Sequence, residues 1–169
     1  FAVGKTTFVG SISEIEPLTT EAALTRVSEG VDDTSKVSTK TSTTVAMDFG
    51  RITLGSDLIL YLFGTPGQDR FWFMWDDLVR GAIGAVVLID TRRLEDCFPA
   101  VDYFAEHRIP FVVGMNCCDG QVSHSPDDVR EALAVSPDTP VFLVDARERE
   151  STKSALLELV QHALVRATA

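Results

Sequence analysis

Residues 1–12 read FAVGKTTFVGSI, and the segment Gly4-Lys5-Thr6-Thr7 matches the end of the phosphate-binding motif G-x-x-x-x-G-K-[ST]. In this motif the glycine lets backbone N–H groups face a phosphate, the lysine bridges the outer phosphates, and the hydroxyl of Thr6 binds Mg²⁺. The same tripeptide also fits an ordinary turn that caps a helix. The segment therefore predicts a nucleotide site only if other parts of the chain supply the remaining contacts.

The pattern after about residue 45 predicts the fold class. Continuous apolar runs, which suit central strands of a parallel sheet, occupy residues 84–89, 110–115 and 140–144. Helical patterns occupy residues 68–80, 94–108, 126–135 and 151–166. Residues 45–54 and 57–63 alternate like two strands of a hairpin. This alternation predicts a doubly wound α/β sheet, mostly parallel, with one antiparallel edge hairpin.

Two features before residue 45 complete the predicted organisation. A phosphate loop normally joins a central strand to a helix, so we expect a short strand upstream of Phe1 in the natural protein. Residues 16–43 are rich in Thr, Ser, Glu and Asp, which predicts a long flexible polar loop with a short helix over 20–27. The whole of 1–169 is predicted to form one domain.

Composition excludes several classes of function. The net charge of −10 argues against sequence-independent binding of nucleic acid and against electrostatic docking on an anionic membrane. The three cysteines lack a C-x-x-C spacing, so we expect free thiols rather than disulfides or a zinc site. No apolar stretch is long enough to span a membrane, and no signal peptide is visible. These features together predict a cytoplasmic protein.

A guanine-specific site is predicted at the ends of two strands. Asn116 and Asp119 follow a predicted strand, where ligands bind in open α/β sheets. The carboxylate of Asp119 there can accept from both N1–H and the amino group of guanine, which adenine cannot match. Ala146 follows the last strand and offers a backbone N–H to the guanine oxygen. Each segment alone also fits an ordinary turn or a strand-to-helix loop.

Two further segments complete the pattern of a nucleotide switch. Thr43-Thr44 precede one strand of the hairpin, and a threonine there completes Mg²⁺ coordination. Gly67 follows the other strand, where its N–H meets the γ-phosphate, and Gln68 orients the attacking water. Although residues 64–67 also fit a simple turn, these weak signals occur in the order that a switch requires.

The aromatic run 71–75 contains both tryptophans of the chain. Trp75 is predicted to face the core, whereas Trp72 and Phe73 point elsewhere on a helix. We expect these two side chains to form a partner surface that changes with the nucleotide state. A helix that is buried on all sides is the alternative.

These residues resemble the small Ras-like GTPases. Residues 44–49 resemble their first switch and second strand, Gly67-Gln68 the start of the second switch, and Asn116, Asp119 and Ala146 their guanine-specificity motifs. The segments GKTTFVGSISEI, TVAMDFGRI, FGTPGQDRFWFMW and NCCDG are most similar to the ATP/GTP-binding proteins of actinobacterial conservon operons, which are distant relatives of the polarity GTPase MglA. The similarity covers nearly the whole chain.

The resemblance implies a three-layer P-loop NTPase (small G-protein) fold and a regulatory GTPase that binds GTP/GDP with Mg²⁺ and hydrolyses GTP slowly. It implies partners as well: a Roadblock/LC7-type protein and a sensor-kinase-like complex, which would hold the protein at the inner face of the cell membrane. The alternatives are a nucleotide-binding scaffold with negligible hydrolysis and an ATP-binding P-loop protein.

Three positions depart from the Ras-like pattern. Gly64 stands where an acidic residue opens the second switch, although MglA-like proteins lack that residue too. Cys117 replaces the lysine that packs over the base, and Asp145 replaces a common Ser or Thr. Because losing a carboxylate near a metal weakens its binding, we expect weak or metal-sensitive nucleotide binding and slow unassisted hydrolysis.

Overall fold

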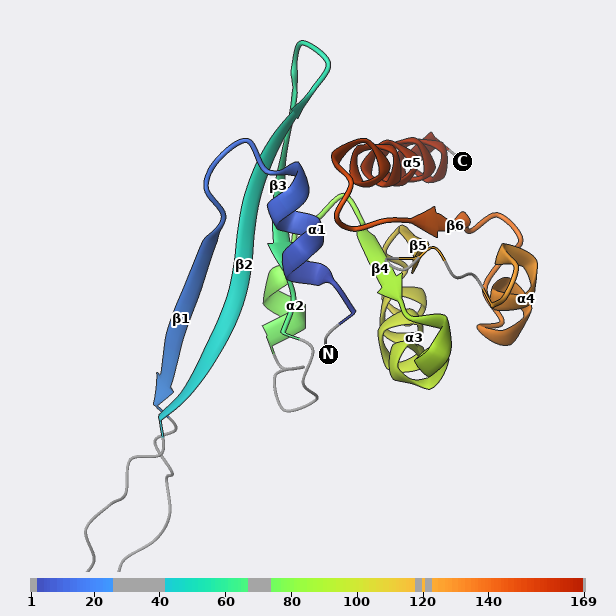
Figure 1. Ribbon diagram of the computed structural model, residues 1–169, viewed down its shortest axis with the longest axis horizontal. Helices are drawn as coiled ribbons and strands as arrows, with labels where there is room; N and C mark the ends of the chain where they lie inside the picture. The colour runs from blue at the N-terminus through green and yellow to red at the C-terminus, as the bar shows by residue number, and fades with distance from the viewer. Residues whose placement is uncertain (1–2, 26–41, 67–73, 118–119, 121–122, 169) are drawn as a thin grey trace, which may run out of the picture.

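The computed structural model describes residues 3–25, 42–66, 74–117, 120 and 123–168, with the backbone alone for 19–25 and 42–46. Its strands form two sheets (Figure 1). The first sheet is antiparallel and contains β1 (Leu18–Thr25), β2 (Ser42–Leu54) and β3 (Leu58–Gly64). The second is parallel and contains β4 (Ala85–Ile89), β5 (Phe111–Asn116) and β6 (Val141–Val144). The mixed α/β class, the parallel strands and the antiparallel β2–β3 hairpin agree with the prediction, whereas the single sheet that was predicted is replaced by two sheets.

The helices connect and cover these strands. They are α1 (Lys5–Ile12), α2 (Trp75–Leu78), the 3-10 helix η2 (Thr91–Cys97), α3 (Phe98–Glu106), α4 (Pro126–Ala132) and α5 (Arg149–Thr168). The helix predicted over 94–108 is divided between the end of η2 at Cys97 and α3, which has Pro99 in its first turn and ends at Glu106. The one predicted over 126–135 begins with a capping box between Ser125 and Asp128 and ends by residue 134.

A strand replaces part of the predicted polar loop. Residues 18–25 form β1, which pairs with β2 from Leu18 opposite Phe49 to Thr25 opposite Ser42. The short helix predicted over 20–27 is therefore wrong for its described part. The threonines and alanines of β1 carry no clear period, but the ladder to β2 pairs the backbone groups on one edge of the strand. Residues 26–41 lie outside the described part of the chain.

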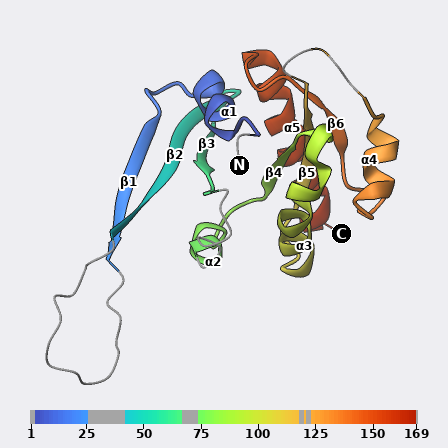
Figure 2. The ribbon, with the colours of Figure 1, turned by 60° about the horizontal axis from the view of Figure 1, so that its bottom comes forward.

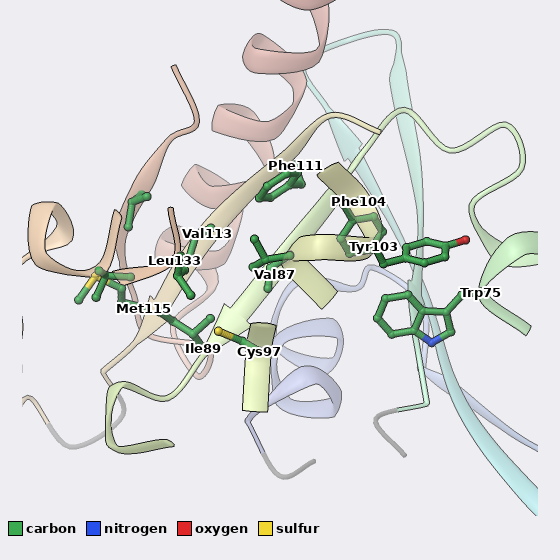
Figure 3. Packing of buried hydrophobic residues seen from close by; sticks show 13 residues of the cluster. Trp75, Val87, Ile89, Cys97, Tyr103, Phe104, Phe111, Val113, Met115 and Leu133 are labelled. Atoms are coloured by element: carbon green, nitrogen blue, oxygen red, sulfur yellow. The ribbon is translucent and has the colours of Figure 1, made fainter. Parts of the chain in front are cut away.

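Alternate residues of β4 divide between two apolar clusters. Val87 and Ile89 belong to a cluster with α2, α3 and α4, which Figure 3 shows around Trp75 and Phe104. Val86 and Leu88 face a second cluster, which contains Phe8 and Ile12 of α1, Ile52 of β2, Leu60 of β3 and Leu156 of α5. The period of two thus gives the parallel sheet two covered faces, as its continuous apolar runs predicted. The second cluster also joins the two sheets.

An apolar cavity of about 530 Å³ lies between β3 and β4. Its lining includes Leu60 and Leu62 of β3, Val86 and Leu88 of β4, and Val3 at the entrance to α1. Among the described strands no ladder joins β3 to β4. The strand expected upstream of Phe1 stays a prediction.

Candidate functional site

The first turn of α1 presents backbone N–H groups at one edge of the molecule. Gly4 precedes the helix with φ of 102°, and its carbonyl accepts from the N–H of Phe8 at 2.8 Å. Gly4 offers no side chain to cap the free N–H groups of this turn, so they are available to an anion. Lys5 is half-buried, and burial lowers its pKa while the charge of Asp48 opposes that shift. A positive helix end and a poorly hydrated ammonium group together favour a phosphate.

Asn116, the last residue of β5, ties the start of α1 to the segment after β6. Its Nδ2 donates to the carbonyl of Val3 at 2.8 Å, and its Oδ1 accepts from the N–H of Ala146 at 3.2 Å. A Cβ atom at Gly4 would lie 2.6 Å from the same Nδ2 and 3.5 Å from the Cβ of Ala146. Gly4, Asn116 and Ala146 therefore meet at one place, although they are far apart in sequence. The N–H of Ala146 must exchange or share its bond to Asn116 in order to reach a guanine oxygen.

Asp48 of β2 is a site residue that the sequence analysis missed. The hydroxyl of Thr6 donates to its Oδ2 at 2.6 Å. Asp48 lies directly opposite Gly64 in the ladder between β2 and β3, and a Cβ atom at Gly64 would stand only 3.0 Å from the same Oδ2. A signal was present in the sequence: Asp48 shares the parity of the buried residues Ile52 and Leu54, so it lies on the face that turns towards α1.

The segment after β6 is held by its own acidic residue. The carboxylate of Asp145 accepts from the backbone and guanidinium of Arg147, with Arg147 Nη2 at 2.7 Å from Oδ2. The hydrogen bonds from Arg147 lower the pKa of Asp145 to about 2. The N–H of Asp145 donates to Ser151 of α5 at 2.9 Å. The departure at Asp145 thus has a structural role, since it fixes the loop that carries Ala146.

Thr44 does not lie where the sequence placed it. It falls inside β2, opposite Ala23 of β1, rather than before the strand. It precedes Asp48 by four residues in the strand, a separation of about 13 Å at the usual rise. The end of the β1–β2 ladder that holds Thr25 and Ser42 extends away from α1 (Figures 1 and 2). In this arrangement Thr44 is not brought to Thr6.

Some of the remaining residues named in the sequence analysis are described in the structure, and others lie outside its described part. Thr7 is exposed in the first turn of α1, and Cys117 is half-buried with its N–H on the carbonyl of Val144. The following predicted residues lie outside the described residues: Gly67, Gln68, Trp72, Phe73 and Asp119.

The donor set at Thr6 and Asp48 fits Mg²⁺ only as part of a nucleotide complex. Within the described ranges no group of three or more His, Cys, Asp or Glu side chains could hold a metal ion. A hydroxyl and one carboxylate are, however, the kind of protein oxygens that Mg²⁺ uses beside phosphates and water. A separate property concerns membranes: among the described helices, none has the length and apolar character needed to cross one.

A helix start that can bind phosphate, at the carboxyl edge of a parallel sheet, defines a class of nucleotide-binding α/β proteins. The chain belongs to the family described as "Conserved hypothetical ATP binding protein", whose model matches residues 1–166.

The chain is also similar to two individual curated proteins. The chain is 32% identical to the uncharacterized protein MJ1339 of Methanocaldococcus jannaschii over 91 residues, which are 53% of this chain and 58% of that protein. It is 30% identical to the Ras-related protein SEC4 of Candida albicans over 128 residues, which are 69% of this chain and 60% of that protein. The chain thus spans about three fifths of the length of each relative.

Proposed function

We propose that this protein is a small regulatory GTPase of the P-loop class, with the three-layer fold of small G proteins. The observation that carries the proposal is Asn116, which holds the carbonyl of Val3 and the N–H of Ala146 with one side chain. A phosphate loop and two candidate base-binding segments thereby share one edge of the sheet. The family description and the similarity to a Ras-related protein both support nucleotide binding.

The proposed chemistry assigns roles to residues of this edge. Lys5 and the N–H groups from Gly4 to Thr7 bind the phosphates, and Thr6 ligates Mg²⁺. Asn116, Asp119 and Ala146 select guanine, since a carboxylate at Asp119 matches two donors that adenine lacks. When Mg²⁺ is bound it neutralises charge on the phosphates. Gly67 then donates to the γ-phosphate, and Gln68 orients the attacking water for slow hydrolysis.

We propose that the part of the β1–β2 ladder around Thr44 is the segment that changes with the bound nucleotide. In the ladder Thr44 lies opposite Ala23, four residues along β2 from Asp48, the carboxylate that accepts from Thr6. We propose that triphosphate binding opens the β1–β2 ladder near Thr44, and that hydrolysis allows the ladder to form again.

A partner surface is proposed beside this element. Tyr61 and Phe63 of β3 are 60% and 52% exposed, and both rings contact Phe49 of β2. This aromatic face of β3 is suited to a protein partner, and we propose that Trp72 and Phe73, which lie outside the described residues, also contact a partner. By resemblance, the proposed partners are a Roadblock/LC7-type protein and a sensor-kinase-like complex, which would bring the protein to the membrane.

ATP binding is the second candidate, and the family description favours it. A third candidate is a nucleotide-binding scaffold without turnover, which Gly64 motivates. One experiment separates the three. The purified protein, expressed with its natural N-terminus, is denatured, the released nucleotide is identified, and phosphate release is followed with GTP and with ATP. Guanine nucleotide with GTP turnover supports the proposal. Adenine nucleotide with preferential ATP turnover would overturn it, and guanine nucleotide without turnover in the presence of cell extract would favour the scaffold.

A further inference from the structure

We infer that Asp48 supplies the carboxylate that organises Mg²⁺ and its water at the phosphates, in place of an acidic residue at position 64. The inference rests on the proposed function, which it extends by one positioning residue. It starts from the contact between the hydroxyl of Thr6 and Oδ2 of Asp48, at 2.6 Å. A threonine hydroxyl has lone pairs beside its proton, so it can ligate a metal while it still donates to the carboxylate.

The β2–β3 register explains why an acidic residue on β2 can replace one on β3. Asp48 and Gly64 are direct partners in the antiparallel ladder, so their side-chain positions are neighbours on the same face. A Cβ atom at Gly64 would stand 3.0 Å from Oδ2 and 3.1 Å from Cβ of Asp48. The side chain of Asp48 therefore occupies the space into which a residue at 64 would point. A glycine at position 64 therefore leaves room for the aspartate at position 48, which can provide the carboxylate that position 64 lacks.

Charge supports the same assignment. Lys5 follows Gly4 in the phosphate loop, and the negative charge of Asp48 raises its pKa against the effect of burial. Asp48 is thus close enough to the phosphate-binding end of α1 to act electrostatically there. Mg²⁺ usually binds through one or two carboxylates together with phosphates and water. Since the described residues hold no cluster of acidic and histidine ligands, this carboxylate would matter only when nucleotide is bound.

The test measures the Mg²⁺ dependence of guanine-nucleotide binding, with a fluorescent GDP analogue and a titration of free Mg²⁺. Asp48→Asn keeps the shape and an acceptor for Thr6 but removes the charge. We expect it to raise the Mg²⁺ midpoint by about 10- to 100-fold relative to the wild type. Asp57→Asn is the control, because Asp57 is an exposed carboxylate on the β2–β3 turn.

A paired exchange keeps the inference testable if Asp48→Asn folds poorly. Gly64→Asp alone brings a side chain against Asp48, whereas Asp48→Gly combined with Gly64→Asp moves the acid to the opposite strand. We expect the double variant to recover most of the wild-type Mg²⁺ midpoint. An unchanged midpoint in Asp48→Asn, or a double variant as weak as Asp48→Gly, would overturn the role of Asp48 while GDP binding itself stands. Wild-type protein that binds no guanine nucleotide, with or without Mg²⁺, would overturn the proposed function and this inference together.

Discussion

Gly4 carries two independent constraints at the residue scale. Its φ of 102° lies in the region that favours glycine, and a Cβ atom there would meet Nδ2 of Asn116 at 2.6 Å. Gly10, in the same helix, has no such neighbour within 4 Å. Gly4, just before α1, therefore lies in close contact with its surroundings, whereas Gly10 within α1 faces open space.

We predict opposite effects of alanine at these two positions. Gly4→Ala should lower the free energy of unfolding by about 1–2 kcal/mol from backbone conformation alone, with a further loss from displaced Asn116. Gly10→Ala should raise it by about 0.5–1 kcal/mol, because alanine is the better helix residue. Urea denaturation of both variants measures the difference. Equal changes in the two variants would contradict the close approach of Gly4 to Asn116.

Asp145 gives a prediction for pH dependence. Its bonds from Arg147 hold its pKa at about 2, below the ordinary value of 3.8. A lowered pKa contributes stability that is present above about pH 4 and is lost as the pH falls towards 2. Arg147→Gln should raise the pKa of Asp145 towards 3.8, so the stability difference from the wild type should shrink over that range.

Carboxyl NMR titration measures this shift directly. Asp90 is an internal control, because Arg92 lowers its pKa to about 2 through the same Asp-x-Arg arrangement after β4. In Arg147→Gln the pKa of Asp90 should stay near 2. If the pKa of Asp145 also stayed there, Arg147 would not be the cause of its shift.

The sequence predicted one side of the candidate site better than the other. Gly4, Asn116 and Ala146 each stand where a loop meets a strand or helix, and parallel strands bring such loops to one edge. Asp48 lies inside a strand, so its relation to Thr6 depends on how α1 packs against β2. Alternation along residues 45–54 indicates a face but does not give the partner on the next element.

At the scale of elements, α2 is fixed to α3 by an aromatic contact and a hydrogen bond. Trp75 packs edge-on against Tyr103 with ring centroids 5.2 Å apart, and the hydroxyl of Tyr103 donates to Oδ1 of Asp76 at 2.6 Å. Burial and the contact with Asp76 raise the pKa of Tyr103 to about 12. The prediction that Trp75 faces the core is confirmed, since it is 5% exposed.

Removing the Tyr103 hydroxyl tests this attachment. Tyr103→Phe should lower the free energy of unfolding by about 1 kcal/mol, because the ring stays packed while one hydrogen bond to an exposed carboxylate is lost. Tyr61→Phe is the matched control, and we expect a change within about 0.5 kcal/mol, because Tyr61 is 60% exposed. Chemical denaturation compares the pair. A loss in Tyr61→Phe as large as in Tyr103→Phe would argue against a specific bond between α2 and α3.

The strands with a clear apolar pattern in the sequence were the ones that could be predicted. The apolar run of β5 is buried on both faces, and β4 is buried from Val87 to Ile89, whereas β6 leaves Leu143 46% exposed. β1 has no such period, and its residues form a strand because β2 extends far enough to pair with them. Long-range pairing of this kind overrides local composition, which is why residues 18–25 were expected in a polar loop.

At the scale of the whole molecule, the second core cluster connects the two sheets. Ile52 and Leu60 of the first sheet share that cluster with Leu88 and Val144 of the second, and α1 and α5 cover both. A nucleotide bound at Lys5 and Asn116 would touch elements from each side. Ligand binding should therefore stabilise the molecule as one unit.

Lys5→Ala separates ligand binding from folding. Burial disfavours the charged form of Lys5, so without nucleotide we expect the variant to melt no lower than the wild type. For wild type, Mg·GDP at about 100 times its Kd should add about 2.7 kcal/mol, which raises Tm by roughly 5–11 °C for a domain of this size. Lys5→Ala should lose this shift, Asp57→Asn should keep it, and Mg·ADP should give a smaller one. A full shift in Lys5→Ala, measured by scanning calorimetry, would mean that the nucleotide stabilises the fold from somewhere other than the start of α1.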